Sequence, residues 1–350
     1  MRAKSLLNLV SDRLYSLPLL VLYLTDGCNS RCVTCDIWRS PRRNMRPELI
    51  NTLTEAIREL DVRWVLLSGG EAMQHPDWPA IARRFREQGA YVMLLTNGLL
   101  LARQAAEAAA SVDEVIVSLD GGTAATYAAI RGVDGLTRVL DGIRAVRAGG
   151  VPVVTRTTLQ RQNFREMPAI IQAAREAGAS RISFLTVDVS SLHAFGPRFT
   201  ADAALAVVSE APDPAAPALS PSEVVEFAQV VERVIADYGD AFASGLIAEP
   251  PDKLRRMVQY FAALNGDGAF PAPRCNAPHT SVVVEVDGTL RPCYFLPAFG
   301  RLEAGALQLS QAVNLPTAQA LRQAYRAGQR PECERCVCPL YKGPRALLRM

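Results

Sequence analysis

The feature that most limits the fold is a regular alternation of short apolar, β-rich segments with amphipathic helical segments. It begins near residue 17 and continues to about residue 187. Several of the β-rich segments are apolar throughout, as strands covered on both faces are. This alternation indicates a parallel sheet built from βα units. The expected strands are 19–24, 64–67, 91–95, 114–119, 153–159 and 182–187, and the expected helices are 47–60, 78–88, 103–110, 136–148 and 167–177.

Length, composition and charge narrow the class of protein. With 350 residues, 49% of them apolar, the chain is long enough for one large α/β domain and a smaller one. The chain has 38 Lys and Arg against 35 Asp and Glu, so it lacks the large excess of positive charge that is typical of nucleic-acid-binding proteins. The apolar run at 17–24 is too short for a membrane span and has no small-residue cleavage site. We therefore expect a soluble, cytoplasmic protein with no membrane partner.

Cysteine is the informative residue type. Three of the eight cysteines, Cys28, Cys32 and Cys35, are spaced C-x3-C-x2-C. A chain of this size does not need disulfide staples, and grouped thiols in it indicate metal ligands in a reducing compartment. A complete thiolate set for one [4Fe–4S] cluster is four, so three cysteines leave one iron open. The motif predicts a reactive iron–sulfur site, with a zinc half-site as the alternative for the motif taken alone.

Polar and glycine-rich motifs follow the expected strands, at the end where (β/α) barrels carry their chemistry. The turn S-G-G-E at 68–71 follows the second strand, and its glycines let the backbone approach a ligand closely. The third strand ends in T-N-G at 96–98, which by itself is a weak turn signal. The fourth ends in S-L-D-G at 118–121. The fifth carries Arg156, which can clamp a carboxylate or pair with an acid of the barrel wall.

With the cysteine loop and the S-G-G-E turn together, the chain resembles the radical S-adenosylmethionine (SAM) superfamily from about residue 17 to residue 187. The resemblance implies a partial (β/α)6 TIM-like barrel in which Cys28, Cys32 and Cys35 hold the catalytic [4Fe–4S] cluster. In that family the open iron chelates the amino and carboxylate groups of SAM. Reduction of the cluster cleaves SAM, and the resulting 5′-deoxyadenosyl radical abstracts a hydrogen atom from the substrate.

The resemblance also assigns residues to SAM. The candidate cofactor-binding residues are Gly69, Gly70, Glu71, Ser118, Asp120, Arg156 and Trp38. In this assignment the S-G-G-E turn holds the amino group of SAM, and Ser118 and Asp120 contact its ribose or carboxylate. Arg156 would clamp the carboxylate. Trp38 is the candidate cover for the adenine, because Thr34 stands where the family usually has an aromatic residue.

A second group of cysteines lies near the C-terminus. Cys275 and Cys293 flank an expected hairpin at 281–286 and 289–291, and an expected helix at 316–327 leads to Cys333 and Cys336. The arrangement C-x12-G-x4-C followed by C-x2-C resembles the twitch and SPASM auxiliary-cluster domains. These four thiolates would ligate one auxiliary [4Fe–4S] cluster, and a structural zinc site with four cysteine ligands is the alternative.

Cys338 is left over after both sets are counted. One interpretation is an alternative cluster ligand or a small buried apolar residue. The other is a catalytic hydrogen-atom donor, because related radical epimerases invert a carbon centre with a thiol.

The sequence predicts four parts. These are an N-terminal lead-in at 1–16, the radical SAM partial barrel at 17–190, a helical insertion covering the barrel mouth at 191–268, and a small β-hairpin plus helix domain for the auxiliary cluster at 269–345.

The leading hypothesis for function is the oxidation or dehydrogenation of a small molecule in a biosynthetic pathway, because an auxiliary cluster can accept the electron left after hydrogen abstraction. The cysteine loop begins at residue 28, which leaves no room for a leader-peptide domain and favours a small-molecule substrate. The alternatives are a radical epimerase that uses Cys338, a peptide-modifying maturase with separate leader recognition, and a non-catalytic metal-binding module. We expect a protein reductant such as flavodoxin or ferredoxin.

Overall fold

The computed structural model describes residues 2–189, 217–303, 305–338, 340, 341 and 343. In this part of the chain one sheet of nine strands has the order β6-β5-β4-β3-β2-β1-β7-β8-β9. From β1 to β6 every neighbouring pair is parallel, which confirms the α/β class and all six expected strands. These strands are β1 (Leu19–Thr25), β2 (Trp64–Gly69), β3 (Tyr91–Thr96), β4 (Glu114–Ser118), β5 (Val153–Leu159) and β6 (Arg181–Thr186).

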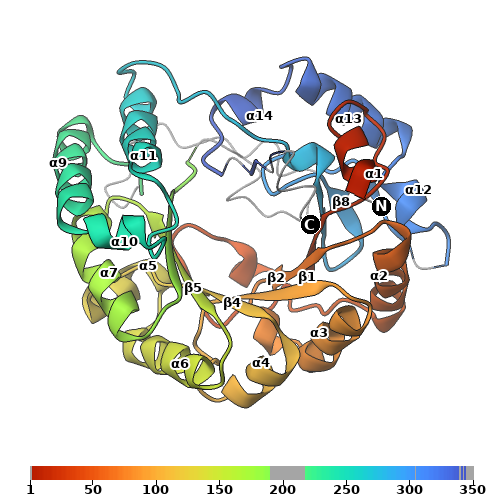
Figure 1. Ribbon diagram of the computed structural model, residues 1–350, viewed down its shortest axis with the longest axis horizontal. Coiled ribbons are helices and arrows are strands. Elements are labelled where there is room, and N and C mark those ends of the chain that lie inside the picture. The colour runs from red at the N-terminus through yellow and green to blue at the C-terminus, as the bar shows by residue number, and fades with distance from the viewer. Residues whose placement is uncertain (1, 190–216, 304, 339, 342, 344–350) are drawn as a thin grey trace.

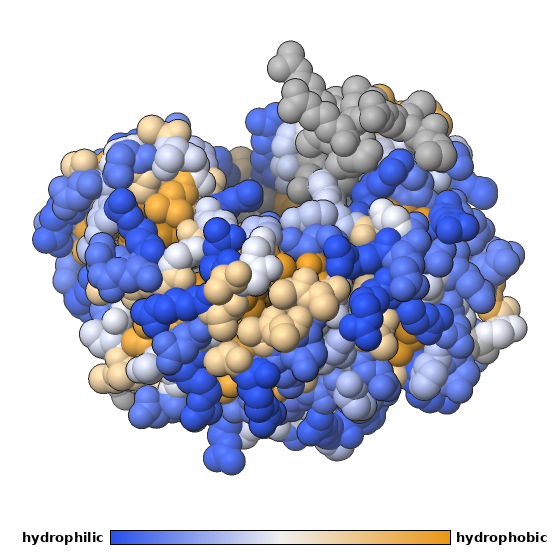
Figure 2. All heavy atoms as spheres, turned by 60° about the horizontal axis from the view of Figure 1, so that its bottom comes forward, coloured by the Kyte–Doolittle hydropathy of each residue, from blue (hydrophilic) through white to orange (hydrophobic). Residues whose placement is uncertain are grey.

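The helices that connect these strands lie along the outer side of the curved sheet (Figure 1). They are α2 (Pro47–Glu59), α3 (Trp78–Glu87), α4 (Ala105–Ser111), α5 (Ala124–Arg131), α6 (Leu136–Ala148) and α7 (Met167–Glu176). All five predicted helices are confirmed, and α5 is one that the sequence pattern did not predict. Hydrophilic side chains predominate on this outer face, and apolar side chains gather in its middle (Figure 2). Within the described residues, no helix combines the length and apolarity needed to cross a bilayer.

The core forms where helices and strands face each other. In α6, Leu136, Val139, Ile143 and Val146 fall at helical spacing on one face, and all are buried. Along β5 fully buried residues alternate with Arg156 and Thr158, which are only partly buried. The alternation separates a side covered by helices from a side that faces the barrel interior. Side chains on the second side, such as Arg156, point toward the space inside the barrel.

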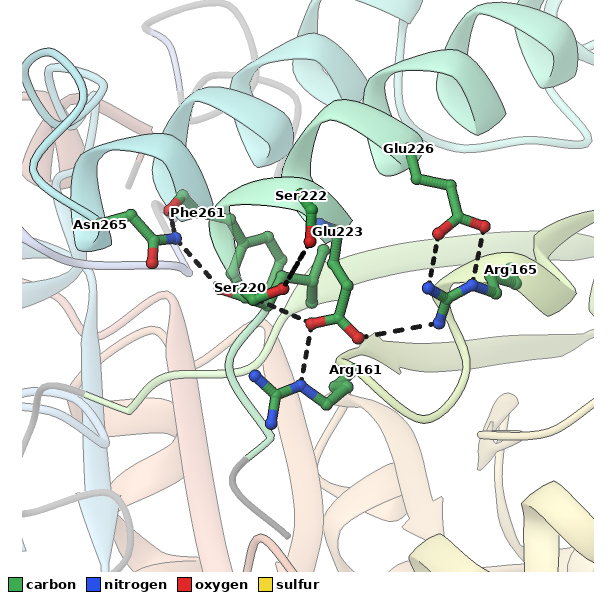
Figure 3. A network of polar contacts seen from close by, with 9 residues as sticks. Arg161, Arg165, Ser220, Ser222, Glu223, Glu226, Phe261 and Asn265 are labelled. Atoms are coloured by element: carbon green, nitrogen blue, oxygen red, sulfur yellow. Dashed lines mark hydrogen bonds and ion pairs between the residues drawn. The ribbon is translucent and has the colours of Figure 1, made fainter. Parts of the chain in front are cut away.

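After β6 the described chain resumes at Pro217 and forms α9 (Pro221–Asp237), α10 (Gly239–Ala243) and α11 (Pro251–Leu264). Residues 191–216 of the predicted helical insertion lie outside the described residues. Ser220 is the N-cap of α9 and forms a capping box with Glu223 (Figure 3). Glu223 also accepts from Arg161, at 2.9 Å, so the helix is anchored to the loop after β5.

The C-terminal part contains η5 (Ala277–His279), β7 (Ser281–Val284), β8 (Thr289–Arg291), β9 (Gly300–Arg301), α12 (Leu309–Ala312), α13 (Pro316–Arg326) and α14 (Pro331–Glu334). The predicted hairpin is confirmed, because β7 and β8 are antiparallel. Its first strand also pairs with β1 in parallel, with Leu19 opposite Ser281. The hairpin thus continues the barrel sheet, which places the second cysteine group beside the strand that leads to the first.

The N-terminal segment joins the same region. After α1 (Arg2–Leu7), Asn8 Nδ2 donates to the carbonyl oxygen of His279 at 3.0 Å. The buried Arg322 of α13 donates to the carbonyl oxygens of Asp12, Pro278 and Val313. One guanidinium therefore ties the N-terminal segment to η5 and α12.

Candidate active site

The three N-terminal cysteines line one cavity of about 180 Å³ at the carboxyl ends of β1 to β4. We call it the N-terminal cysteine cavity and define it by Cys28, Cys32, Cys35, Gly70, Ser118 and Arg131. Carboxyl ends of parallel strands meet at one edge of a sheet, so residues from different βα turns come together here. The cavity is the place where the sequence predicts the open cluster.

Glycines at 69 and 70 allow the S-G-G-E turn to lie directly against the cysteine loop. The Gly70 amide donates to Thr25 O and the Glu71 amide donates to Gly27 O, both at 2.8 Å. A Cβ on Gly70 would lie 2.3 Å from Gly27 O, and one on Gly69 would lie 2.4 Å from Thr25 O. Only glycine fits at this approach.

The other side of the cysteine loop rests on the end of α5. The amides of Arg31 and Val33 donate to the carbonyl oxygens of Arg131 and Ile130, each at 3.0 Å. Carbonyls in the last turn of a helix have no partner within the helix, so they are free to accept from a loop. Gly132 then ends α5 in the left-handed conformation, with φ at 66°. The loop is therefore held from two sides by the protein itself.

Glu71 lies behind the cavity wall and joins two loops. Its carboxylate accepts from the Met73 amide at 3.1 Å, the Thr96 hydroxyl at 2.8 Å and the Asn97 amide at 2.7 Å. The side chain is buried, and burial raises its pKa against the lowering by those three donors. The carboxylate does not line the cavity, whereas Gly69 and Gly70 do. Its predicted contact with SAM stays a prediction, and its observed contacts position the turn.

Asn97 is a site residue that the sequence indicated only as part of a turn. Its Nδ2 donates to Asn29 Oδ1 at 2.7 Å and lies 3.9 Å from the Cys28 sulfur. Its amide binds Glu71, as above, and its Oδ1 accepts from the Leu99 amide at 3.0 Å. A turn that ends β3 therefore reaches into the cysteine loop. The T-N-G sequence at a strand end was the available signal.

Arg131 is a second residue to which the sequence assigned no role in the site. Its guanidinium lines the N-terminal cysteine cavity and pairs with Asp120 at 2.9 Å. Burial lowers the pKa of Arg131, but the nearby Cys32, Asp120 and Tyr127 outweigh that effect, so the pKa is raised. Asp120 also accepts from the Thr158 amide at 2.8 Å and does not line the cavity. The predicted SAM contact of Asp120 stays a prediction, and its observed partner is the cation that lines the cavity.

Three buried polar atoms of residues that line this cavity have no hydrogen-bond partner in the described part of the chain. They are the hydroxyl of Ser30, the indole Nε1 of Trp38 and Nε of Arg131. A buried donor without an acceptor is costly, so a ligand that supplies acceptors fits these positions. Trp38 thus lines the cavity in which SAM is predicted to bind, and Ser118 lines the same cavity.

The chemistry of the thiols also fits a metal cluster. Burial raises the pKa of Cys28 to about 12 and raises that of Cys32 as well. Buried thiolates without a cation are therefore unfavourable here, and iron supplies the positive charge that stabilises them. The residues present fit a cluster held by three cysteines.

The C-terminal cysteines gather on a second cavity, of about 150 Å³. We call it the auxiliary cysteine cavity, and its cysteines are Cys275, Cys293, Cys333, Cys336 and Cys338. Burial raises the pKa of Cys293 to about 12 and that of Cys333 to about 11. All four predicted ligands and the spare thiol thus line one space, and Cys338 is the exposed member.

Long-range contacts hold this cavity in shape. Gly288 turns the hairpin with φ at 91°, and a Cβ there would lie 2.2 Å from Leu302 O. The Tyr325 hydroxyl donates to Cys275 O at 2.5 Å, which fixes the first cysteine against α13. The Tyr294 ring, next to Cys293, lies 5.8 Å from the Tyr23 ring of β1. The two cysteine cavities are therefore linked through packed residues of β1 and the hairpin.

Among the described residues, no set of three or more Cys, His, Asp or Glu side chains is positioned to share a single metal ion.

The predicted SAM clamp by Arg156 stays a prediction, because the structure places this residue at the other cysteine group. It lines the auxiliary cysteine cavity and is not among the residues that line the N-terminal cysteine cavity. The alternative, an ion pair with a barrel acid, is also not formed in the described part of the chain.

Comparison with known proteins identifies the two regions. A model of the radical SAM superfamily matches residues 22–174, and a model of the SPASM iron–sulfur cluster-binding domain matches residues 275–337. The AdoMet-dependent heme synthase of Methanosarcina barkeri is 33% identical over 162 residues, which is 45% of this chain and 46% of that protein. The PqqA peptide cyclase of Streptomyces rochei is 33% identical over 169 residues, 47% of this chain and 46% of that protein. The chain spans about half the length of these curated relatives.

Solved structures agree on the fold. Streptococcus suis SuiB bound to S-adenosylmethionine superimposes with a TM-score of 0.66 at 15% identity, covering 97% of this chain and 76% of that one. At this identity the likeness concerns the fold alone. The two matched regions lead to one conclusion: the chain contains a radical SAM domain, matched over residues 22–174, and a C-terminal SPASM iron–sulfur domain, matched over residues 275–337.

Proposed function

We propose that Cys28, Cys32 and Cys35 hold the catalytic [4Fe–4S] cluster of this radical SAM enzyme, and that SAM binds in the N-terminal cysteine cavity. The cofactors that accompany the two domains are this cluster, SAM and auxiliary iron–sulfur. The observation that carries the proposal is that three thiols, two backbone-exposing glycines and Ser118 line one cavity at the strand ends. When bound, the cluster and SAM supply a 5′-deoxyadenosyl radical for hydrogen abstraction.

The chain's own residues position and protect that chemistry. Gly69 and Gly70 present backbone to the ligand, and Trp38 and Ser30 supply unpaired donors to it. Arg131 lines the same cavity as the three thiols and would supply a positive charge to the thiolates and to the carboxylate of SAM. Behind the cavity wall, two buried carboxylates, those of Glu71 and Asp120, keep these groups in place.

We assign the auxiliary cluster to Cys275, Cys293, Cys333 and Cys336. Four thiolates complete a cubane, so this cluster needs no open iron and is suited to electron transfer. An electron acceptor on the far side of the substrate favours net oxidation of a small molecule, with a flavodoxin or ferredoxin supplying electrons to the first cluster.

Epimerisation is the second candidate, because Cys338 is exposed and lines the auxiliary cysteine cavity. Once the substrate is known, the variant Cys338→Ala distinguishes epimerisation from dehydrogenation. An epimerase stops inverting its substrate in D2O while still forming 5′-deoxyadenosine, whereas a dehydrogenase is largely unaffected.

A peptide substrate is the third candidate. SuiB has also been solved with its precursor peptide SuiA, at a TM-score of 0.65 and 14% identity to this chain. Co-purification with a short precursor peptide would replace the small-molecule proposal.

The proposal is tested by anaerobic reduction of the reconstituted protein with SAM and chromatography of the products. We expect 5′-deoxyadenosine from the native protein and none from Cys32→Ala. Equal amounts from both would contradict the assignment of the cluster.

A further inference from the structure

Arg156 occupies a position between the two cysteine cavities. In the β4–β5 register it is paired with Ser118, which lines the N-terminal cysteine cavity. Its own side chain lines the auxiliary cysteine cavity. In the proposed function, the substrate carbon reacts at the N-terminal cysteine cavity, and the auxiliary cluster in the other cavity accepts the electron. A residue between the two cavities, such as Arg156, can therefore contact the substrate.

The guanidinium of Arg156 has no partner in the described part of the chain. Its Nε is buried and makes no hydrogen bond, and neither a hydrogen bond nor an ion pair involves its other nitrogens. The charged group that interacts with Arg156 is Glu114, on the neighbouring strand β4. Arg181 and, more weakly, Arg156 lower the pKa of Glu114, but burial outweighs both and raises it. Glu114 therefore acts on Arg156 only at a distance, and in the described part of the chain no acid of the barrel wall forms a direct ion pair with Arg156.

Three other arginines that are buried or partly buried have partners. Arg131 pairs with Asp120 at 2.9 Å, and Arg291 pairs with Glu285 at 2.5 Å. The side chain of Arg322 donates to three backbone carbonyls. Arg156 is partly buried, and a guanidinium withdrawn from water is normally paired, so its lack of a partner in the described part of the chain indicates a missing anionic ligand.

The surroundings of Arg156 restrict what that ligand is. The lining of this cavity is mainly apolar and includes Leu19, Val21 and Leu66 of the first two strands. Among the described residues its one carboxylate, Glu332, pairs with Arg330 at 2.6 Å. The C-terminal cysteines line the same cavity and would hold the auxiliary cluster. A planar guanidinium binds carboxylate and phosphate oxygens in pairs. We propose that Arg156 binds an anionic group, a carboxylate or a phosphate, of the enzyme's substrate.

This inference rests on the proposed function, because it treats the space between the cavities as the substrate site. The test is anion-dependent stability of the anaerobically reconstituted holoenzyme. Sodium phosphate and sodium acetate serve as probes, with sodium chloride at equal ionic strength as the reference. We expect one or both oxyanions to raise the melting temperature of the native protein by at least about 2 °C. Arg156→Gln should lose that rise.

Arg181→Gln is the matched control. Arg181 begins the adjacent strand, also acts on Glu114, and lines neither cysteine cavity. It should respond to oxyanions as the native protein does. An equal response of native protein and Arg156→Gln would overturn the proposal, as would a native protein that responds to neither oxyanion.

The auxiliary cluster is the competing partner of Arg156. In that case Arg156→Gln would shift the midpoint potential of the auxiliary cluster to more negative values and the oxyanions would have no effect, which would also overturn the proposal. The stability readout needs no turnover. An Arg156-dependent response without 5′-deoxyadenosine formation would refute the proposed function and leave the anion site standing.

Discussion

At the scale of residues, buried polar side chains decide how the N-terminal cysteine cavity is shaped. Glu71 gives both carboxylate oxygens to donors from two loops, and Asn97 extends that network to the cysteine loop. Neither residue needs to touch SAM to affect its binding. Their observed contribution is to connect the S-G-G-E turn, the end of β3 and the cysteine loop.

Glu71→Gln is expected to destabilise the protein. Glutamine has one acceptor oxygen, so at least one of the donors Met73 N, Thr96 Oγ1 and Asn97 N loses its partner, at a cost of about 1–3 kcal/mol. Urea unfolding measures the free energy. Glu55→Gln, at an exposed position of α2, is the control and should be nearly neutral. Equal losses of unfolding free energy in the two variants would contradict the structural role of Glu71.

Gly69→Ala is expected to cost more than Gly89→Ala. Both glycines have positive φ, at 126° and 93°, so both substitutions introduce backbone strain of about 1–2 kcal/mol. Only at Gly69 does the added Cβ meet backbone, 2.4 Å from Thr25 O, whereas nothing lies within 4 Å at Gly89. Iron content after reconstitution should fall for Gly69→Ala alone. A loss of iron in both variants would show that strain, not close approach, matters.

His279 makes stability depend on pH. Burial, with Arg326 and Arg322 nearby, lowers its pKa to about 4. The unfolded chain therefore binds a proton between its ordinary pKa of 6.5 and about 4 while the folded chain does not. Stability is complete above about pH 6.5 and falls as the pH drops toward 4, by at most about 3 kcal/mol. Unfolding of native protein and His279→Asn at several pH values should show a smaller loss in the variant. Parallel curves would contradict this assignment.

At the scale of elements, α9 is fastened at its first turn. Ser220 caps the helix, and Glu223 both completes the capping box and accepts from Arg161 (Figure 3). Arg165 adds a pair with Glu226 at the surface. These contacts fix the point at which the described chain returns to the barrel.

Ser220→Ala should lower the free energy of unfolding by about 1 kcal/mol, because the amide of Glu223 loses its acceptor. Ser222→Ala removes only the hydroxyl contact with Ser220, at 3.3 Å, and should stay within about 0.5 kcal/mol. Denaturant unfolding compares the two. A larger loss for Ser222→Ala would mean that the cap is misassigned.

The sequence predicted elements better than it predicted contacts. The bounds of β5 and α6 were predicted to the residue, because hydrophobic period and flanking Gly or Pro are local signals. α5 was missed because its eight residues give a weak pattern. The pairing of β7 with β1 and the roles of Asn97 and Arg131 depend on partners far away in the chain. The sequence correctly predicted that Arg156 lies on the fifth strand, but it could not predict which of the two cysteine cavities this residue lines.

At the scale of the whole molecule, one sheet carries both cysteine groups. The loop of the first group follows β1, and the hairpin of the second begins with the strand beside β1 (Figure 1). Both cysteine cavities border the barrel interior between them, one through Ser118 of β4 and the other through Arg156 of β5. If the proposed function holds, the substrate would lie between the two clusters in this interior.

The most direct test of this account is iron and sulfide content measured together with SAM cleavage in cysteine variants. Native protein should bind about eight irons, two cubanes per chain. Replacing Cys28, Cys32 and Cys35 together by alanine should leave about four irons and abolish 5′-deoxyadenosine. Replacing Cys333 and Cys336 should also leave about four irons but preserve SAM cleavage. A triple variant that keeps all its iron, or that still cleaves SAM, would contradict the account.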